Sequence, residues 1–416
     1  MNTAINAGIQ SAGFKKYDYK NIALNARLNN GNIESNGSVN DPNLQLNYSA
    51  TANLQGKYPA IDATLILDTA QLYALNLYKD TVNASFMAYV KALSLDPKNL
   101  DMYALIDSSK INFKNKSYSL DTIALKANTS DGNNNLSFNS PIADIKANGN
   151  FEYDKLSASV MQYADKYYNI TDTVIANGSP QQISFEGLIK EHPLVKDLVP
   201  ALEYNNIDFK GSYTSAGEDS ALNLSVNLPY LVYNTNSIRS GSINIATFNE
   251  AINAQVAFDT LNVNANRFFA AKITAKAMGD SLSVDVATQD DKKTDRYSLG
   301  ATIVKNDEAY LFSLKNNLLL NYQKWNVANN NKITYSPDGI LVNNFVLSSD
   351  SAIISAASKE NILNSPINIS IESFDIKNIA ALANSDTLLA SGIVNAKFSL
   401  SEFDKKLPAF TGNAEI

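Results

Sequence analysis

Residues 21–29 read NIALNARLN and residues 43–50 read NLQLNYSA, and this pattern decides the fold class. In both stretches apolar side chains occupy every second position, and the residues between them are small or polar. Strict alternation places the two sets of side chains on opposite faces of a β-strand. The same period of two recurs at residues 222–228, 282–286 and 367–371. The dominant pattern of the chain therefore predicts β-strands.

Turn residues separate these alternating runs at intervals of about 10 to 15 residues. Examples are NNGN at 29–32, SNGS at 35–38 and PDG at 337–339. Asn-Gly and Asp-Gly pairs are signals of hairpin turns. The 55 asparagines of the chain suit such turns, because Asn tolerates left-handed backbone conformations. We expect about 25 to 30 strands in a predominantly antiparallel meander.

Four stretches interrupt the period of two and predict short amphipathic helices, at residues 68–79, 157–168, 193–204 and 374–384. Pro193 suits the first turn of the third helix, whereas Pro200 is expected to end or kink it. Neither a Ser/Gly linker nor an abrupt change of composition divides the sequence. Residues 1–416 are therefore predicted to form one continuous repetitive array.

So many strands cannot form one flat open sheet, because large sheets twist, curl or split. A closed barrel, stacked sandwiches and a sheet curled into a trough are the alternatives. The fold class predicted is mainly β: an elongated, curled, taco-like antiparallel sheet with an apolar groove and a few short helices. An apolar face that the protein does not fill requires another apolar occupant.

Composition excludes several classes of chemistry. Cysteine is absent and His192 is the only histidine, which rules out disulfides, thiolate metal sites and multi-histidine centres. The net charge is -7 and only four basic residues are arginine, so we expect no nucleic-acid partner. No apolar run is long enough for a transmembrane helix, and the first residues lack the pattern of a secretory signal.

No catalytic motif is present, so we expect no enzyme activity, no cofactor and no metal. His192 precedes Pro193 without a Ser or Asp arrangement and is interpreted as a solvated loop residue. DGNNN at 131–135 lacks the acidic spacing of a calcium loop and predicts a plain turn. Asp290 and Asp291 are expected to be solvated in a loop, and Trp325 is expected to pack on a sheet face.

The residues from Trp325 to Ile416 carry a resemblance to a known family. The pattern W-x-V…N-x-I-x-Y…G-I…N-F-x-L-S begins at Trp325, followed by F-D-I…I-A-A-L at 374–382, S-G-I-V-N-A at 391–396 and P-A-F-T-G-N-A-E-I at 408–416. This stretch resembles the TamB family of translocation and assembly module proteins, particularly its versions in Bacteroidota-type bacteria. Residues 133–156 have a similar strand-and-turn sequence pattern, and AsmA-like proteins share this repeating pattern.

The resemblance implies an elongated, taco-shaped sheet whose apolar groove carries phospholipid towards the outer membrane and supports protein assembly there. It also implies a periplasmic location, an N-terminal anchor in the inner membrane, and an outer-membrane barrel partner of the TamA or BamA type. The anchor and the partner-contacting end of the family are missing from this sequence. We therefore expect an internal fragment of a longer chain, with anchoring and docking outside it.

The function predicted is a non-catalytic lipid conduit in which phospholipid acyl chains lie on the inward apolar residues. Continuous weak binding suits transport better than one deep pocket. The expected groove lining consists of Leu222, Leu224, Val226, Leu228, Ile243, Ile245, Leu282, Val284, Val286, Ile367, Ile369 and Ile371. Their facing rests on the period of two and would reverse with a slip of one residue.

Other classes of protein remain open from the residues alone. A structural or adhesive surface protein of stacked β-sandwiches would show the same alternation, with filled cores and no lipid. A transmembrane barrel would require aromatic girdles at two levels, which the tyrosines and phenylalanines do not show. An enzyme acting on polysaccharide would require a placed pair of carboxylates.

Overall fold

The computed structural model is mainly β, with 70% strand and 4% helix, and the strands of its described residues pair in antiparallel fashion. Twenty-nine strands and two helices are present among the described residues, so the predicted fold class and meander are confirmed. The chain groups into two compact units. The residues that the structure describes are 2–169, 180–215, 220–264, 266–376, 392–403 and 408–415.

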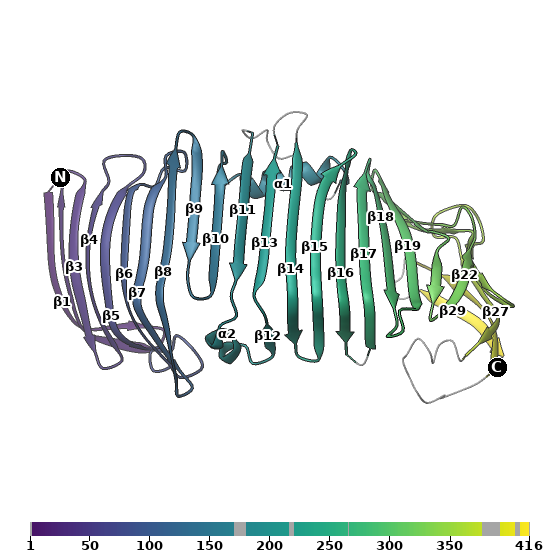
Figure 1. Ribbon diagram of the computed structural model, residues 1–416, viewed down its shortest axis with the longest axis horizontal. Coiled ribbons are helices and arrows are strands. Elements are labelled where there is room, and N and C mark those ends of the chain that lie inside the picture. Colours follow the sequence, from purple (N-terminus) through teal and green to yellow (C-terminus); the bar gives the residue numbers. More distant parts are fainter. Residues whose placement is uncertain are drawn as a thin grey trace. The chain divides into compact units, whose positions relative to one another are not determined.

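Unit 1 comprises Met1–Ser159, Asn177–Ala201 and Asn205–Ser220. Its strands pair in chain order from β1 to β11, and β13 then pairs with β11 (Figure 1). Its elements are β1 (Asn2–Phe14), β2 (Tyr17–Asn29), β3 (Asn32–Asp41), β4 (Leu44–Asn53), β5 (Ala60–Gln71), β6 (Val82–Ser94), β7 (Asp101–Phe113), β8 (Lys116–Ser130), β9 (Asn133–Asn139), β10 (Ala143–Gly149), β11 (Gln182–Ile189), α2 (Pro193–Leu198) and β13 (Ile207–Thr214).

Unit 2 comprises Val160–Ala176, Leu202–Tyr204 and Ala221–Ile416, and it takes most of helix α1 (Leu156–Asp165). Its strands are β12 (Leu202–Tyr204), β14 (Ala221–Tyr233), β15 (Asn236–Phe248), β16 (Ala251–Val263), β17 (Asn266–Met278), β18 (Ser281–Gln289), β19 (Asp295–Asn306), β20 (Ala309–Leu314), β21 (Leu318–Leu320), β22 (Gln323–Val327), β23 (Lys332–Ser336), β24 (Gly339–Asn343), β25 (Phe345–Ser349), β26 (Ala352–Ser358), β27 (Ile367–Asp375), β28 (Ile393–Ser401) and β29 (Ala409–Glu415).

Two hairpin turns have the backbone conformation that their sequences predict, whereas the turn predicted at 35–38 is wrong, because these residues pair with both neighbours inside β3. Asn30 and Gly31, between β2 and β3, both have positive φ, at 43° and 79°. Asp131 and Gly132 repeat this between β8 and β9, with φ of 51° and 77°. Two successive left-handed residues match the twist of the flanking strands. DGNNN is therefore a turn, as expected.

Left-handed residues also occur inside strands, where they bend the sheet. A non-glycine residue with positive φ interrupts the regular pleat and changes the direction of a strand. The pairing registers shift beside four of these positions, in β7, β8, β17 and β27. The six such residues are Asn21, Ser108, Asp121, Ser240, Ala270 and Ser373.

Three pairs of consecutive short strands in unit 2 are each separated by a break: β20 and β21, β22 and β23, and β24 and β25. We call these breaks, which contain Asn316, Asn331 and Asn344, the asparagine crease. One half of β19 pairs with β20 and the other half with β21. Asn331 spans the break between β22 and β23: its Oδ1 accepts from Leu314 N at 2.7 Å, and its Nδ2 donates to Leu314 O at 2.9 Å. Asn316 Oδ1 accepts from Val327 N at 3.1 Å. Side-chain amides thus replace backbone pairing where the strands are interrupted.

The predicted helices have different outcomes. The helix at 157–168 is confirmed as α1, and that at 193–204 is confined to α2 because Pro200 follows it. The helix at 68–79 is wrong: β5 continues to Gln71, and a single turn follows in which Leu75 N donates to Gln71 O. Of the predicted helix 374–384, residues 374–375 end β27, and 377–384 lie outside the described residues.

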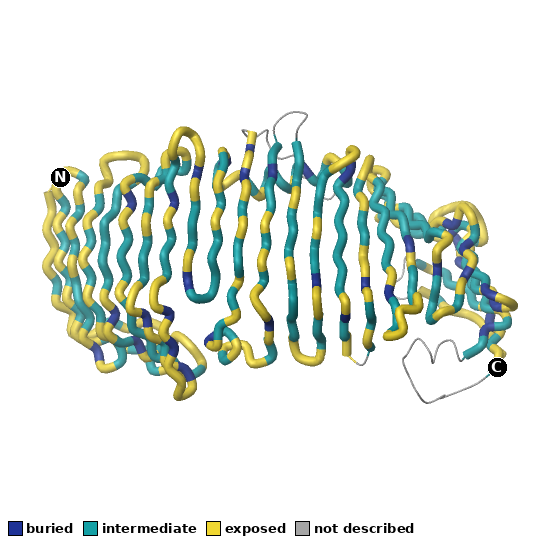
Figure 2. Tube along the Cα trace, in the orientation of Figure 1, coloured by how far each residue is buried: buried dark blue, intermediate teal, exposed yellow. Residues whose placement is uncertain are grey.

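The buried clusters lie mostly towards the ends of strands (Figure 2). In unit 1, Leu75 packs with Leu67 and Ala70, and Leu194 of α2 packs with Phe113 and its neighbours. In unit 2 the cluster is built on β21, β22, β26 and β27. The middle of the long strands is only partly buried.

Candidate functional site: the apolar face of unit 2

Apolar side chains on one face of unit 2 form rows that cross the strands, and we call this surface the apolar face. Directly opposed residues in an antiparallel sheet point to the same side, so each register defines a row. The central row is Val226, Ile243, Val256, Ile273, Val286 and Leu299. The next row is Leu224, Ile245, Ala254, Ala275, Val284 and Ala301.

The structure places the twelve candidate lining residues on this same face. Nine lie on β14, β15 and β18, and Ile367, Ile369 and Ile371 lie on β27. The two groups are connected through β19, β21 and β22, because Tyr297 opposes Leu320 and Leu318 opposes Trp325. Beyond β22, Val327, Leu347, Ile354 and Ile371 oppose one another in turn. The alternation seen in the sequence thus keeps one facing from β14 to β27.

Several residues of the face are absent from the sequence-based list. Strand β16 contributes Ile252, Val256 and Phe258, and β17 contributes Ile273 between alanines. Alternation with alanine is a weak signal on the β17 segment, since alanine is neither strongly apolar nor strand-forming. In β16, by contrast, the period of two at 252–258 is sufficient to predict that Ile252, Val256 and Phe258 share one face.

The long strands leave this face incompletely covered. Of the hydrophobic residues in β14–β18, all of which the structure describes, only Ala251 and Ala271 are buried. Ile273 is 38% exposed, and Leu299 on β19 is 41% exposed. Inner faces of a sandwich pack at the density of a protein core and would bury such residues. The centre of the face therefore resembles a lining more than a filled core.

One border of the apolar face is closed by a packed cluster. Trp325, Val327 and Phe374 are buried there, and the rings of Trp325 and Phe374 lie 6.1 Å apart. Leu314, Leu320 and Leu347 are among the partly buried residues that pack against them. Trp325 thus packs on a sheet face, as expected. Ile367, also buried, is the one candidate lining residue that is fully enclosed.

Tyrosines of the segment 160–169 cross the ends of the strands next to this face. Tyr163 is 1% exposed, and its hydroxyl donates to Thr247 Oγ1 at 2.9 Å. Tyr167 lies beside it, and burial together with the hydrogen bond between the Tyr167 and Tyr163 hydroxyls raises the pKa of Tyr167 to about 12. Asp280 N donates to Tyr167 O at 3.0 Å, which ties the segment to the turn between β17 and β18.

The polar residues considered for catalysis have structural positions. His192 is half-buried at the start of α2, where its Nδ1 accepts from Leu194 N at 3.2 Å, rather than being a solvated loop residue. Burial lowers the pKa of His192, which favours the neutral, accepting imidazole. Asp290 accepts from Thr294 N and Tyr322 OH, and backbone donors lower its pKa. These contacts organise a helix start and a loop.

The described residues contain no group of histidine, cysteine and carboxylate side chains that could hold a metal ion. Among them, no helix has the length and apolar character needed to cross a membrane. Comparison of the chain with family models, curated proteins and solved structures finds no match.

Proposed function

We propose that the apolar face of unit 2 holds the acyl chains of phospholipids and acts as a non-catalytic lipid conduit. The observation that carries the proposal is the central row, which runs in register over six strands while its large side chains stay only partly buried. Exposed apolar surface that is both large and continuous marks an interaction site.

The energetic argument concerns the hydrocarbon. Leaving an acyl chain in water costs about 0.8 kcal/mol per CH₂ group, so two long tails would cost on the order of 25 kcal/mol. A lining made of similar residues removes much of this cost at every position along a row. No single position needs to bind tightly, which is what movement of a lipid requires.

The TamB resemblance supports a wider proposal. The chain would act in the periplasm in phospholipid transport to the outer membrane and in protein assembly there, with an outer-membrane barrel protein of the TamA or BamA type as its partner.

Charge placed on the apolar face tests the conduit. Leu224→Asp, Val284→Asp and Ile369→Asp should each reduce the phospholipid that copurifies with the protein, measured by native mass spectrometry. Ser225→Asp and Ser370→Asp are matched controls, because each neighbours a tested residue but points to the opposite face. The controls should retain lipid.

Two results would overturn the conduit. One is wild-type protein that copurifies without phospholipid and takes up none from vesicles of mixed phospholipids. The other is unfolding of each Asp variant, seen as loss of the thermal transition, because a filled core rather than a lining would behave so. The alternative of a structural or adhesive protein of stacked β-sandwiches predicts both, and the buried cluster around Trp325 is the feature that favours it.

A further inference from the structure

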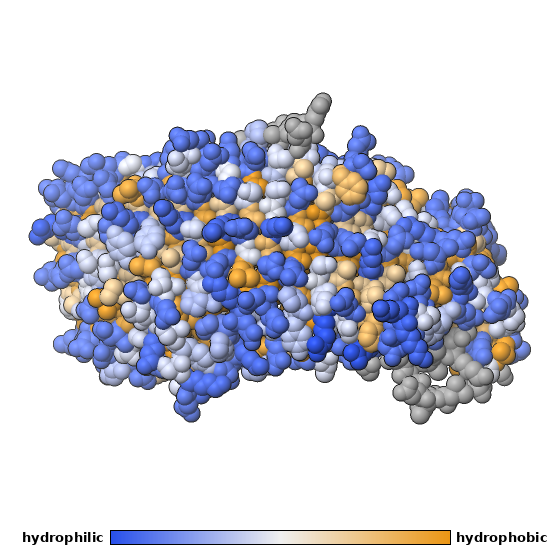
Figure 3. Space-filling view, in the orientation of Figure 1, coloured by the Kyte–Doolittle hydropathy of each residue, from blue (hydrophilic) through white to orange (hydrophobic). Residues whose placement is uncertain are grey.

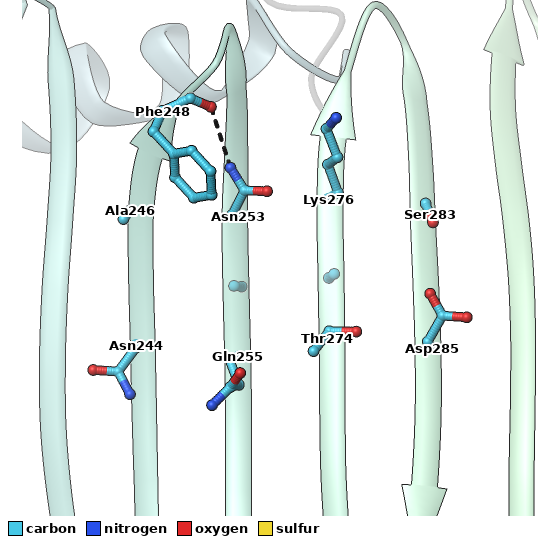
Figure 4. A pocket seen from close by; sticks show the side chains of 11 residues that line it. Asn244, Ala246, Phe248, Asn253, Gln255, Thr274, Lys276, Ser283 and Asp285 are labelled. Atoms are coloured by element: carbon cyan, nitrogen blue, oxygen red, sulfur yellow. Dashed lines mark hydrogen bonds between the residues drawn. The ribbon is translucent and has the colours of Figure 1, made fainter.

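The face of unit 2 opposite the apolar face carries a shallow groove, which we call the polar groove. The groove has a volume of about 450 Å³. The face that carries it is the one on view in Figures 1 and 3, where hydrophilic side chains predominate. Its lining comes from β15, β16, β17 and β18 (Figure 4). The side chains that face it are Asn244, Ala246, Phe248, Asn253, Gln255, Thr274, Lys276, Ser283 and Asp285.

Polar side chains in the groove are arranged in two rows across the strands. The first row is Asn244, Gln255, Thr274 and Asp285, and the second is Ala246, Asn253, Lys276 and Ser283. Neighbouring members of a row are about 4.8 Å apart, the spacing of strands in a sheet. The groove therefore offers a hydrogen-bonding group at each strand.

Three of these groups are available to a ligand. Within the described part of the chain, Gln255, Thr274 and Lys276 have no hydrogen bond or ion pair from their side chains. They lie next to one another, because Gln255 opposes Thr274 and Lys276 is two residues further along the same strand. An amide, a hydroxyl and an ammonium group together can donate to and accept from hydroxyl groups.

The charge of the groove favours a ligand with little charge of its own. Asp285 is held by Lys315 Nζ at 2.6 Å, and Lys315 also donates to Ser283 Oγ at 2.6 Å. Lys276 is then the single charge left over. One cation is too little for a phosphate backbone, whose binding relies on several basic residues.

An aromatic ring lies at one end of the rows. Phe248 is 55% exposed, and its backbone oxygen accepts from Asn253 Nδ2 at 3.3 Å, which places the ring beside the second row (Figure 4). The apolar face of a pyranose ring packs on an aromatic ring, while its hydroxyl groups need amide and hydroxyl partners. The spacing of the strands is close to the length of one sugar unit in an extended β-linked chain.

We propose that the polar groove binds an extended β-linked polysaccharide, with one sugar unit at each of β15–β18 and the first packed on Phe248. This site is independent of the lipid conduit, since it lies on the other face of the same strands. The chain would then contact a glycan on one side and lipid on the other.

The test measures binding of three soluble probes to the full chain by titration calorimetry: chitohexaose, cellohexaose and maltohexaose. The two β-linked probes should bind, and maltohexaose, which is α-linked and curved, should bind at least tenfold more weakly. The combined variant Gln255→Ala, Thr274→Ala, Lys276→Ala should weaken β-linked binding at least tenfold, and Phe248→Ala should weaken it too.

Ser242→Ala is the matched control, because Ser242 is on the same face of β15 outside the groove, and it should bind as wild type does. Circular dichroism verifies that each variant is folded. Absence of binding by both β-linked probes, equal binding of maltohexaose, or full binding by the combined variant would overturn the proposal. Leu224→Asp should keep glycan binding, which separates this test from that of the conduit.

Discussion

At the scale of single residues, buried polar side chains fix the chain where strands end. Asp41 is 1% exposed and accepts from Tyr17 OH at 2.6 Å, from Lys20 N at 3.0 Å and from Asn43 N at 2.8 Å. A buried carboxylate is stable only with such partners. The sequence shows Asp-Pro at this turn but not the tyrosine 24 residues away that completes the site.

Acid should weaken unit 1 through Asp41. Burial alone would raise the pKa of Asp41, but the hydrogen bonds from Tyr17, Asn43 and Lys20 outweigh it, and the net pKa is lowered. Because the folded-state pKa lies below the unfolded value, the stabilisation is present at neutral pH and is lost as the pH falls below about 4. Thermal unfolding between pH 7 and pH 3 measures this dependence.

Asp41→Asn should cost about 1–3 kcal/mol at pH 7, since the new amide places donors against donors, and it should flatten the dependence on pH. Asp18→Asn is the control, because Asp18 is exposed on the neighbouring strand. An unchanged acid response in Asp41→Asn would contradict the assignment.

At the scale of elements, strands followed from the period of two and from Asn-Gly turns because both are local properties. The shared facing of the twelve candidate lining residues could be predicted for the same reason. Interruptions depended on distant partners: Asn331 reads as one of several loop asparagines, and only its partner Leu314 shows that it replaces strand pairing. The stretch 68–79 has helical spacing, yet pairing of β5 with β4 and β6 prevails to Gln71.

Helix α2 should stabilise unit 1 mainly through the burial of Leu194 in a hydrophobic cluster. Leu194 is 3% exposed and packs with Phe113, Tyr118 and Leu120, whereas Leu198 on the same helix is 42% exposed. Leu194→Ala should cost about 2–5 kcal/mol, the range for a buried leucine. Leu198→Ala should change stability little, so urea unfolding of the two variants compares burial within one helix. Equal costs would contradict the packing.

The asparagine crease should depend on amide chemistry. Asn331→Asp removes the two donated bonds to Leu314 O and Ala328 O and sets a carboxylate against both oxygens. We expect a loss of at least about 3 kcal/mol, more than for a neutral buried group. Asn330→Asp, at an exposed turn position, is the control, and urea unfolding at pH 7 compares them. A small decrease in the free energy of unfolding for Asn331→Asp would contradict this, because it would mean that water solvates the side chain in the crease.

At the scale of the whole molecule, the sequence predicted one continuous array, and the contacts form two compact units. No composition change marks the division, because both units are built from the same alternating strands. Differential scanning calorimetry of the full chain should therefore show two transitions.

Leu194→Ala should lower the transition of unit 1, and Asn331→Asp that of unit 2. A single transition that both variants shift equally would favour one cooperative array.

The in-register rows of the apolar face have a consequence for motion. From Val226 to Leu299, each step to the next strand presents a branched aliphatic side chain at the same height. A hydrocarbon lying along this row and displaced by one strand spacing would exchange its neighbours for near copies of them. The binding free energy would grow with the number of strands spanned, while positions that differ by one strand would have nearly equal free energies.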